Sequence, residues 1–116
     1  MKTHKDLKVY QESLNFVVEI YKITRSFPAI EQFSLSKQLR RAAISIPSNI
    51  SEGASRKGTK EYIQFLYMSL ASLSEVETQI EISFRLNYIR DVDEIAQKIV
   101  FIRIMIQKLI LRLKSP

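Results

Sequence analysis

Side chains that could do acid–base or nucleophilic chemistry are scarce in this chain of 116 residues. His4 is the single histidine and no cysteine occurs, so a Cys–His nucleophile is impossible and a Ser–His pair is disfavoured. Glu77 and Glu81 stand one helical turn apart, with Glu75 nearby, and such carboxylates can transfer protons or hold a cation. No His or Asp joins them on an inward face, so a solvated acidic face is the preferred interpretation. We therefore expect no enzyme activity, catalytic residue, cofactor or metal site.

A pair of glycines raises the question of a phosphate-binding loop. Gly53 and Gly58 have the G-x-x-x-x-G spacing, but Thr59 and Lys60 reverse the required order of Lys before Ser or Thr. No strand precedes the segment, because residues 44–50 continue a helical pattern. The segment is therefore predicted to be a basic turn between two helices, and no small-molecule substrate is expected.

Two groups of basic residues could instead hold phosphates by charge. They are Lys37, Arg40 and Arg41, and Arg56, Lys57 and Lys60. Free amides at the helix start near Thr59 would add positive potential to the second group. Such groups bind phosphates without reading base sequence. Most aromatic residues fall on inward faces, which disfavours a platform for stacking single-stranded bases. These six residues are the candidate nucleic-acid-binding set.

Charge is distributed unevenly along the chain, whose formal net charge is +6. Residues 1–60 carry eleven Lys and Arg against five acids, and residues 98–116 carry five and no acid. The middle, residues 61–97, carries two against seven acids. Two interpretations stay open: complementary charge between neighbouring helices, which is the common use of charged faces, or a basic surface for nucleic acid.

The sequence has no pattern typical of a secreted or membrane protein. Residues 1–10 are charged and polar, unlike the apolar run of a secretory signal. The most apolar stretch, residues 99–113, is interrupted by Arg103, Gln107, Lys108 and Arg112, whereas a membrane span needs about 20 apolar residues. We expect a cytoplasmic protein with no membrane partner.

Four segments with helical periodicity would position these residues, so the chain is predicted to be all-α. They are Asp6 to Phe27, Ser34 to Ala54, Thr59 to Asn87 and Val92 to Leu113. Ser34 or Ser36 could cap the second segment and Thr59 the third. Pro47 should kink the second segment, and Asn49 could bond a backbone group that the proline leaves free. Short connections predict one antiparallel up-down-up-down four-helix bundle spanning residues 1–116.

Each segment has a predicted inward stripe. In the first it is Leu7, Tyr10, Leu14, Val17 or Val18, and Tyr21. In the second it is Leu35, Leu39, Ala42, Ile46, Ile50 and Gly53. In the third it is Tyr62, Leu66, Ser69 or Leu70, Leu73, Val76, Ile80 and Phe84. In the fourth it is Ile95, Ile99, Ile102, Ile106, Leu109 and Leu113.

The last segment also has a second apolar face, formed by Val100, Phe101, Ile104, Met105, Ile110 and Leu111. A surface helix of a monomer should have one apolar stripe, so a second one indicates an interface. Ile44 on the second segment points away from its inward stripe in the same manner. The predicted oligomer interface is therefore Ile44, Val100, Phe101, Ile104, Met105 and Leu111. The alternative is that the last helix is central within a monomer.

The stretch from Gln38 to Gly53, QLRRAAISIPSNISEG, resembles the block Q-L-R-R-A-x-x-S-I-P-x-N-I-x-E-G of a known family. This is the four-helix-bundle family named for open reading frames in intervening sequences of bacterial 23S ribosomal RNA. Residues 6–10, and Arg56 with the start of the next segment, resemble it too. Ser51 replaces a more usual Ala.

The resemblance implies a homopentameric four-helix bundle without enzyme activity. It also implies a fold similar to the accessory protein of diversity-generating retroelements, a basic pentamer that works with a reverse transcriptase and nucleic acid. Fold does not fix function, so two hypotheses remain. One is a homo-oligomeric module that binds RNA or DNA through basic surface, with a protein partner alongside. The other is an assembly or scaffold protein with no nucleic-acid role.

Overall fold

The computed structural model describes residues 3–116, and within them the chain is helical with no strand. The main elements are α1 (Lys8–Thr24), α2 (Leu35–Ala54), α3 (Thr59–Arg85) and α4 (Asp93–Lys114). Two short 3-10 turns, η1 (His4–Asp6) and η2 (Ala29–Glu31), precede α1 and α2. The predicted all-α class is confirmed. The single domain predicted for residues 1–116 includes residues 1 and 2, which lie outside the described part.

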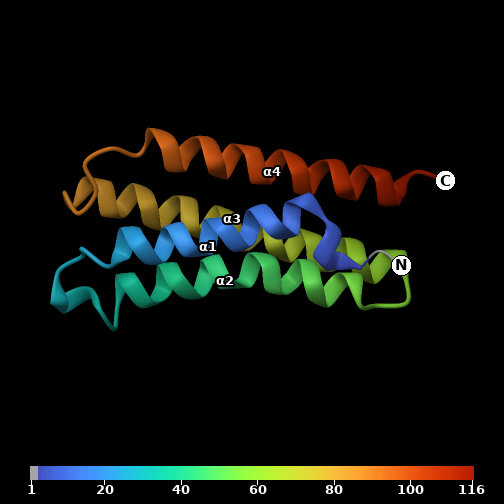
Figure 1. Cartoon of the computed structure of the whole chain (residues 1–116), viewed down its shortest axis with the longest axis horizontal. Coiled ribbons are helices and arrows are strands. Elements are labelled where there is room, and N and C mark those ends of the chain that lie inside the picture. Colours follow the sequence, from blue (N-terminus) through green and yellow to red (C-terminus); the bar gives the residue numbers. More distant parts are fainter. Residues whose placement is uncertain (1–2) are drawn as a thin grey trace.

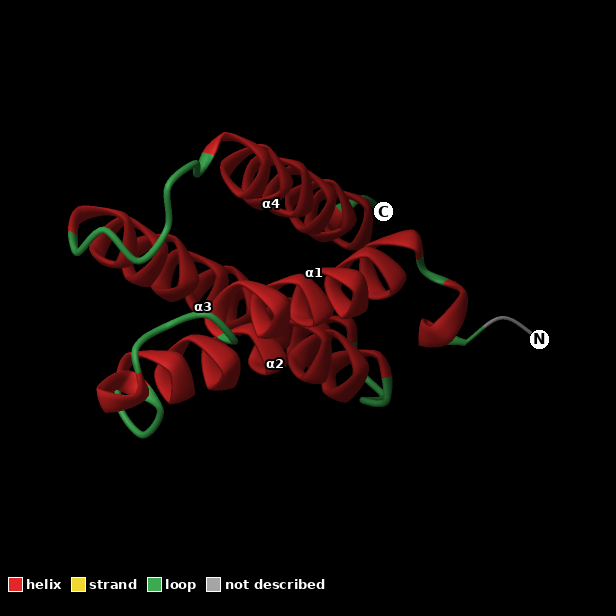
Figure 2. Cartoon of the chain, turned by 60° about the vertical axis from the view of Figure 1, so that its left-hand side comes forward, coloured by secondary structure: helices red, strands yellow, loops and turns green. Residues whose placement is uncertain are grey.

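Successive helices run in opposite directions along a molecule of 48 × 24 × 22 Å (Figure 1). Each helix packs against its neighbours in sequence order, and α4 also packs against α1, while the diagonal pairs make no close backbone contact in the described chain. Figure 2 shows α4 on the side of the bundle away from α2. The arrangement is a four-helix bundle, as predicted.

The tightest packing joins α2 to α3. All six residues of the predicted α2 stripe are buried. Gly53 lets the helices approach, because a Cβ added there would lie 2.8 Å from the Phe65 Cβ. Ser69 of α3 donates a hydrogen bond of 2.9 Å from its hydroxyl to the Ile46 carbonyl. The buried Ser69 hydroxyl therefore keeps a hydrogen-bond partner, and this bond joins α3 to α2.

The predicted inward stripe of α1 is only partly right, because Leu7, Tyr10 and Val17 pack against the core from its edge and are not fully buried. The buried residues are Val9, Ser13, Phe16, Ile20 and Thr24. Leu14 and Val18 are 37% and 54% exposed instead. Ser13 and Thr24 can be buried because each hydroxyl bonds a carbonyl one turn earlier, at 2.7 Å to Val9 and 2.8 Å to Ile20. A prediction from polarity alone misses such residues, because it assigns Ser and Thr to the solvent-facing side of the helix.

Smaller corrections concern α3 and the helix starts. Phe84 is 40% exposed, and Ser83 is buried in its place. Gly58 is the N-cap residue of α3, not Thr59, which is already helical. Ser34 occupies the N-cap of α2 but makes no side-chain cap bond. The first helix is also shorter than predicted, since it begins at Lys8 and ends at Thr24. A hydrogen bond from the Phe27 amide to the Thr24 carbonyl turns the chain before Pro28.

Pro47 lies within α2, which continues through it without a break. A proline removes the amide that would bond the carbonyl four residues earlier, here that of Ala43. The Asn49 side chain donates to the Ser45 carbonyl at 2.9 Å, so its predicted bond to the freed group is wrong. The carbonyl of Ser45 is one turn before Asn49 on the same side of the helix, whereas that of Ala43 is on another side.

Candidate nucleic-acid interface

The two predicted basic groups do not form one site. Lys37 lies in the first turn of α2, and Arg56 follows the end of the same helix. At 1.5 Å per helical residue, about 28 Å of helix axis separates them. Arg41 is exposed and shares a shallow hollow with Glu75 of α3, without an ion pair. The groups belong to opposite ends of the bundle.

Arg40 points towards α1 and not to open surface. Its Nε donates to the Thr24 hydroxyl at 2.9 Å. Its guanidinium carbon lies 4.4 Å from the centre of the Tyr21 ring, within the range of a cation–π contact. Arg40 is therefore fixed in the junction between α1 and α2.

Arg56 is paired within its own end of the bundle. Its guanidinium lies 3.4 Å from a Glu52 carboxylate oxygen and 3.9 Å from one of Glu61, and it stacks on Phe65. These pairs offset its charge. Lys57 and Lys60 are exposed, and no ion pair holds either of them in the described chain. They are the members of the second group free to meet a phosphate.

The alternating helix directions bring distant basic segments to one end, which we call the basic end. It consists of residues 3–8, 52–62 and 108–116, and Figure 1 shows the segment before α1 and the end of α4 there beside the α2–α3 turn. Its Lys and Arg residues are Lys5, Lys8, Arg56, Lys57, Lys60, Lys108, Arg112 and Lys114. The acids of the same segments are Asp6, Glu52 and Glu61. The sequence contained this signal in its two basic flanks, but their meeting depends on topology.

The opposite end has balanced charge. Residues 22–38 and 81–94, which form it, contain five Lys and Arg and five Asp and Glu. Two α4 cations in the body of the bundle also pair with neighbouring helices, Lys98 with Glu19 and Arg103 with Glu77. Some of the Lys and Arg residues are therefore neutralised by acids of neighbouring helices, whereas Lys and Arg outnumber the acids at the basic end.

Contacts at the basic end order several of its side chains. A hollow of about 250 Å³ brings Lys8 of α1 together with Lys108 and Arg112 of α4. The Lys114 ammonium donates to the Tyr67 hydroxyl at 3.0 Å. Burial raises the pKa of the Tyr62 phenol, and the charge of Arg112 opposes that rise. Cations from different helices thus lie near enough to act on one polyanion.

Exposed apolar residues form two separate surfaces. Val100, Ile104 and Leu111 lie on α4, being 49%, 44% and 64% exposed. Phe101 is 43% exposed beneath the Lys8 ammonium, while Met105 packs against the core. Ile110, which was assigned to the second face, is buried at 4% exposure. The predicted outer face of α4 is thus narrower than the sequence suggested.

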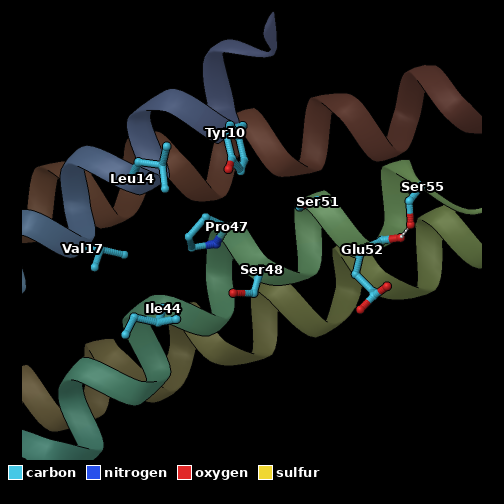
Figure 3. Close-up of a pocket in the computed structure, with 9 residues that line it drawn as sticks. All are labelled: Tyr10, Leu14, Val17, Ile44, Pro47, Ser48, Ser51, Glu52 and Ser55. Atoms are coloured by element: carbon cyan, nitrogen blue, oxygen red, sulfur yellow. Dashed lines mark hydrogen bonds between the residues drawn. The ribbon is translucent and has the colours of Figure 1, made fainter. Parts of the chain in front are cut away.

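Ile44 belongs to the second apolar surface, a groove between α1 and α2 of about 410 Å³ (Figure 3). One part of the groove is apolar, with Leu14, Val17 and Ile44, and the other part contains Ser48, Ser51, Ser55 and Glu52. Since α2 and α4 are diagonal in the bundle, Ile44 does not share a face with the exposed residues of α4.

The acidic residues of α3 are engaged by neighbours. Glu77 pairs with Arg103 and Glu81 with Arg85, each at 2.9 Å, and Glu75 accepts a bond of 3.2 Å from Gln79. Among the described residues no group of three His, Cys, Asp or Glu could hold a metal ion. None of the helices in residues 3–116 has the length and apolarity needed to span a membrane. The expected cytoplasmic location stays a prediction.

Residues 5–108 match the model of the family described as 23S rRNA-intervening sequence protein. The chain belongs to this family. The match covers all four helices up to the last turns of α4, and it confirms the resemblance inferred from the block between Gln38 and Gly53. A comparison with curated proteins gives no match. Family membership thus identifies a small helical protein and leaves its biochemical role to be argued from the surface.

Proposed function

We propose that this member of the 23S rRNA-intervening sequence protein family is a non-enzymatic, homo-oligomeric module that binds RNA or DNA through its basic end. The observation that supports the proposal best is the excess of cations where residues 3–8, 52–62 and 108–116 meet. The opposite end, of similar size, has no such excess. Electrostatic contacts of this kind act on the phosphate backbone and carry little base specificity.

The apolar surfaces support self-association as a ring. A two-fold interface uses the same patch on both partners, whereas a ring uses two different patches in a head-to-tail contact. The α4 face with Ile104 and the α1–α2 groove with Ile44 are two such patches, on different sides of the bundle. The proposal, in line with the family resemblance, is a closed homopentamer in which α4 of one subunit enters the groove of the next.

Repetition in such a ring would strengthen nucleic-acid binding. Each subunit contributes one basic end, and contacts that are weak singly reinforce one another when they engage one polyanion together. Within each end, Lys57, Lys60 and Lys108 are exposed and outside any ion pair of the described chain. These three side chains are the ones we expect to contact phosphates, with Lys8 and Arg112 beside them.

The test is a titration of labelled single-stranded RNA, single-stranded DNA and duplex DNA, followed by fluorescence anisotropy at two salt concentrations. The first variant carries Lys57→Gln, Lys60→Gln and Lys108→Gln. The matched control carries Lys22→Gln, Lys37→Gln and Arg90→Gln, which changes net charge equally at the balanced end. We expect the first variant to bind weakly and to lose about 0.9 in the salt slope on duplex DNA for each phosphate contact removed.

The control variant should bind nearly as well as the native chain. Equal loss in both variants would mean that net charge alone attracts nucleic acid and that the basic end is no site. Absence of binding at low salt would favour the scaffold role, for which the two exposed apolar surfaces are the supporting observation.

A further inference from the structure

A polar pocket lies at the balanced end of the bundle, where α1 ends and α2 begins (the cyan connection in Figure 1). Its volume is about 330 Å³. It is lined by Thr24, Arg25, Phe27, Pro28, Ala29, Gln32, Ser36 and Arg40. Two of these residues are arginines and none is acidic, although this end of the bundle has no net charge. A local excess of positive charge therefore lines this cavity.

Ser36 is the most informative residue of the pocket. It is only 4% exposed, and its hydroxyl makes no hydrogen bond within the described chain. The other buried hydroxyls of residues 3–116, those of Ser13, Thr24, Ser69 and Ser83, all donate to carbonyls. The Ser36 hydroxyl makes no such bond and borders the pocket, where its oxygen stays open to a ligand. It is therefore free to donate a hydrogen bond to an acceptor in the pocket.

Arg40 enters the same pocket with a fixed orientation. Its Nε bond to Thr24, at 2.9 Å, and its stacking on Tyr21 hold the guanidinium plane in place. No carboxylate pairs with it, and neither terminal nitrogen has a partner in the described chain. A planar guanidinium with two free nitrogens matches two oxygens of a phosphate. Arg25, the C-cap residue that follows α1, adds a second positive charge.

The start of α2 contributes backbone donors beside Ser36. The amide of Leu35 donates to the Glu31 side chain at 3.4 Å, and the Tyr88 hydroxyl holds the other oxygen of that carboxylate at 2.8 Å. Among the described residues, no backbone carbonyl outside the helix accepts from the amides of Ser36 and Lys37. They lie at the positive end of a helix of 20 residues, where anions are stabilised. Glu31 itself does not line the pocket.

We propose that this pocket is a binding site for a phosphate group, either free or as a phosphate monoester. Arg40 and Arg25 neutralise its charge, while the Ser36 hydroxyl and the Gln32 amide donate to its oxygens. The site is separate from the basic end, because it lies at the other end of the bundle. The phosphate site and the proposed nucleic-acid binding can therefore be tested separately, and failure of one does not exclude the other.

The experiment is isothermal titration calorimetry of inorganic phosphate into the full chain at low chloride. We expect saturable binding with one phosphate per chain. Ser36→Ala should weaken it about tenfold, because a bond to a charged oxygen is lost. That substitution removes no bond within the protein, so the fold should be unaffected, and its melting temperature serves as the check. Arg40→Lys keeps the charge but loses the planar fork, and it should weaken binding to a similar degree.

The matched control is the chain with Lys57→Gln and Lys60→Gln, which leaves the pocket intact and should bind phosphate normally. Absence of saturable binding would overturn the proposal. So would phosphate binding by the Ser36→Ala and Arg40→Lys variants that is as strong as that of the native chain, or a loss of binding confined to the control variant.

Two further comparisons identify the source of the phosphate. A nucleoside 5′-monophosphate is compared with its nucleoside, and an oligonucleotide with a 5′-phosphate with one lacking it. Stronger binding of the monophosphate than of inorganic phosphate, abolished by Ser36→Ala, would identify a small ester. A Ser36-dependent preference for the phosphorylated oligonucleotide would identify a nucleic-acid end. No dependence on the phosphate in either pair would contradict the site.

Discussion

At the residue scale, one close contact between α2 and α3 depends on the absence of a side chain at Gly53. A Cβ on Gly53 would lie 2.8 Å from the Phe65 Cβ and 3.2 Å from the Tyr62 carbonyl oxygen. These neighbours belong to the α3 backbone region and cannot rotate away. A Cβ on Gly58, in the following turn, would meet nothing within 4 Å. Gly53 is therefore required by helix packing, whereas Gly58 has room for a side chain.

Gly53→Ala should destabilise the fold by about 1–3 kcal/mol, because the added methyl forces α2 and α3 apart. Gly58→Ala, the matched control, should change the free energy of unfolding by less than about 1 kcal/mol. Urea unfolding followed by circular dichroism measures both. Equal effects of the two substitutions would show that close approach at Gly53 is not what its glycine provides.

Tyr88 links the α3–α4 connection to η2. Its hydrogen bond to the Glu31 carboxylate raises the pKa of the phenol, and burial and the negative charge of Glu31 raise it further. Since the folded pKa lies above the unfolded value of about 10, the stability from this bond is present below pH 10. That stability is lost as the pH rises through the raised pKa.

We expect ultraviolet titration to show two tyrosines that ionise late, Tyr62 and Tyr88, and the late ionisation of Tyr88 should be missing from the Tyr88→Phe variant. Glu31→Gln should return this ionisation towards its ordinary range, because the charged acceptor is removed. If Glu31→Gln leaves the late ionisation unchanged, another group controls Tyr88.

At the element scale, α2 combines a buried stripe with a second, half-open side. Its buried face meets α3, and Pro47, Ile44 and Ser48 line the groove shared with α1. An interior proline removes one hydrogen bond and crowds the preceding turn, so it bends a helix that otherwise continues. The shape of the groove is therefore tied to Pro47.

Replacement of Pro47 by Ala should leave the chain folded and restore the amide that bonds the Ala43 carbonyl. The straighter helix would alter the groove, so we expect assembly to change more than the free energy of unfolding. Light scattering and urea unfolding measure the two quantities, and a crystal structure of the variant would give the helix axis. An unchanged axis with an unchanged oligomer would show that Pro47 has no shaping role.

At the scale of the whole molecule, two different apolar surfaces make a distinctive prediction about assembly. A charge at Ile104 should block the α4 face, and a charge at Ile44 should block the groove, because each would be buried without a partner. In a head-to-tail ring every subunit needs both surfaces. The Ile104→Asp and Ile44→Asp chains should each be a 13.5 kDa monomer.

Mixing the two variants should then produce a one-to-one dimer and nothing larger. The intact α4 face of the Ile44→Asp chain can enter the intact groove of the Ile104→Asp chain, and the remaining surfaces are both blocked. Light scattering of the separate and mixed samples measures this outcome. No dimer on mixing would contradict head-to-tail assembly, and a native chain that is itself monomeric would exclude the ring altogether.

The fold class, the order of the helices and the family could all be predicted from the amino-acid sequence. Scarce glycine and proline, apolar spacing at three and four residues and the block from Gln38 to Gly53 were sufficient, because these signals are local along the chain. The buried stripe of α2, and that of α4 apart from Ile110, were predicted for the same reason. Their core positions are mainly aliphatic, so polarity alone locates the inward face.

The tertiary structure decided what depends on contacts between helices. The centre of the inward face of α1 was missed because Ser13 and Thr24 satisfy their hydroxyls within the helix, which polarity cannot reveal. The sequence predicts Arg40 to be a surface cation, but a hydrogen bond to Thr24 and a cation–π contact with Tyr21 hold it against α1. The basic end arises because antiparallel packing brings together residues far apart in sequence, and no local pattern encodes that proximity.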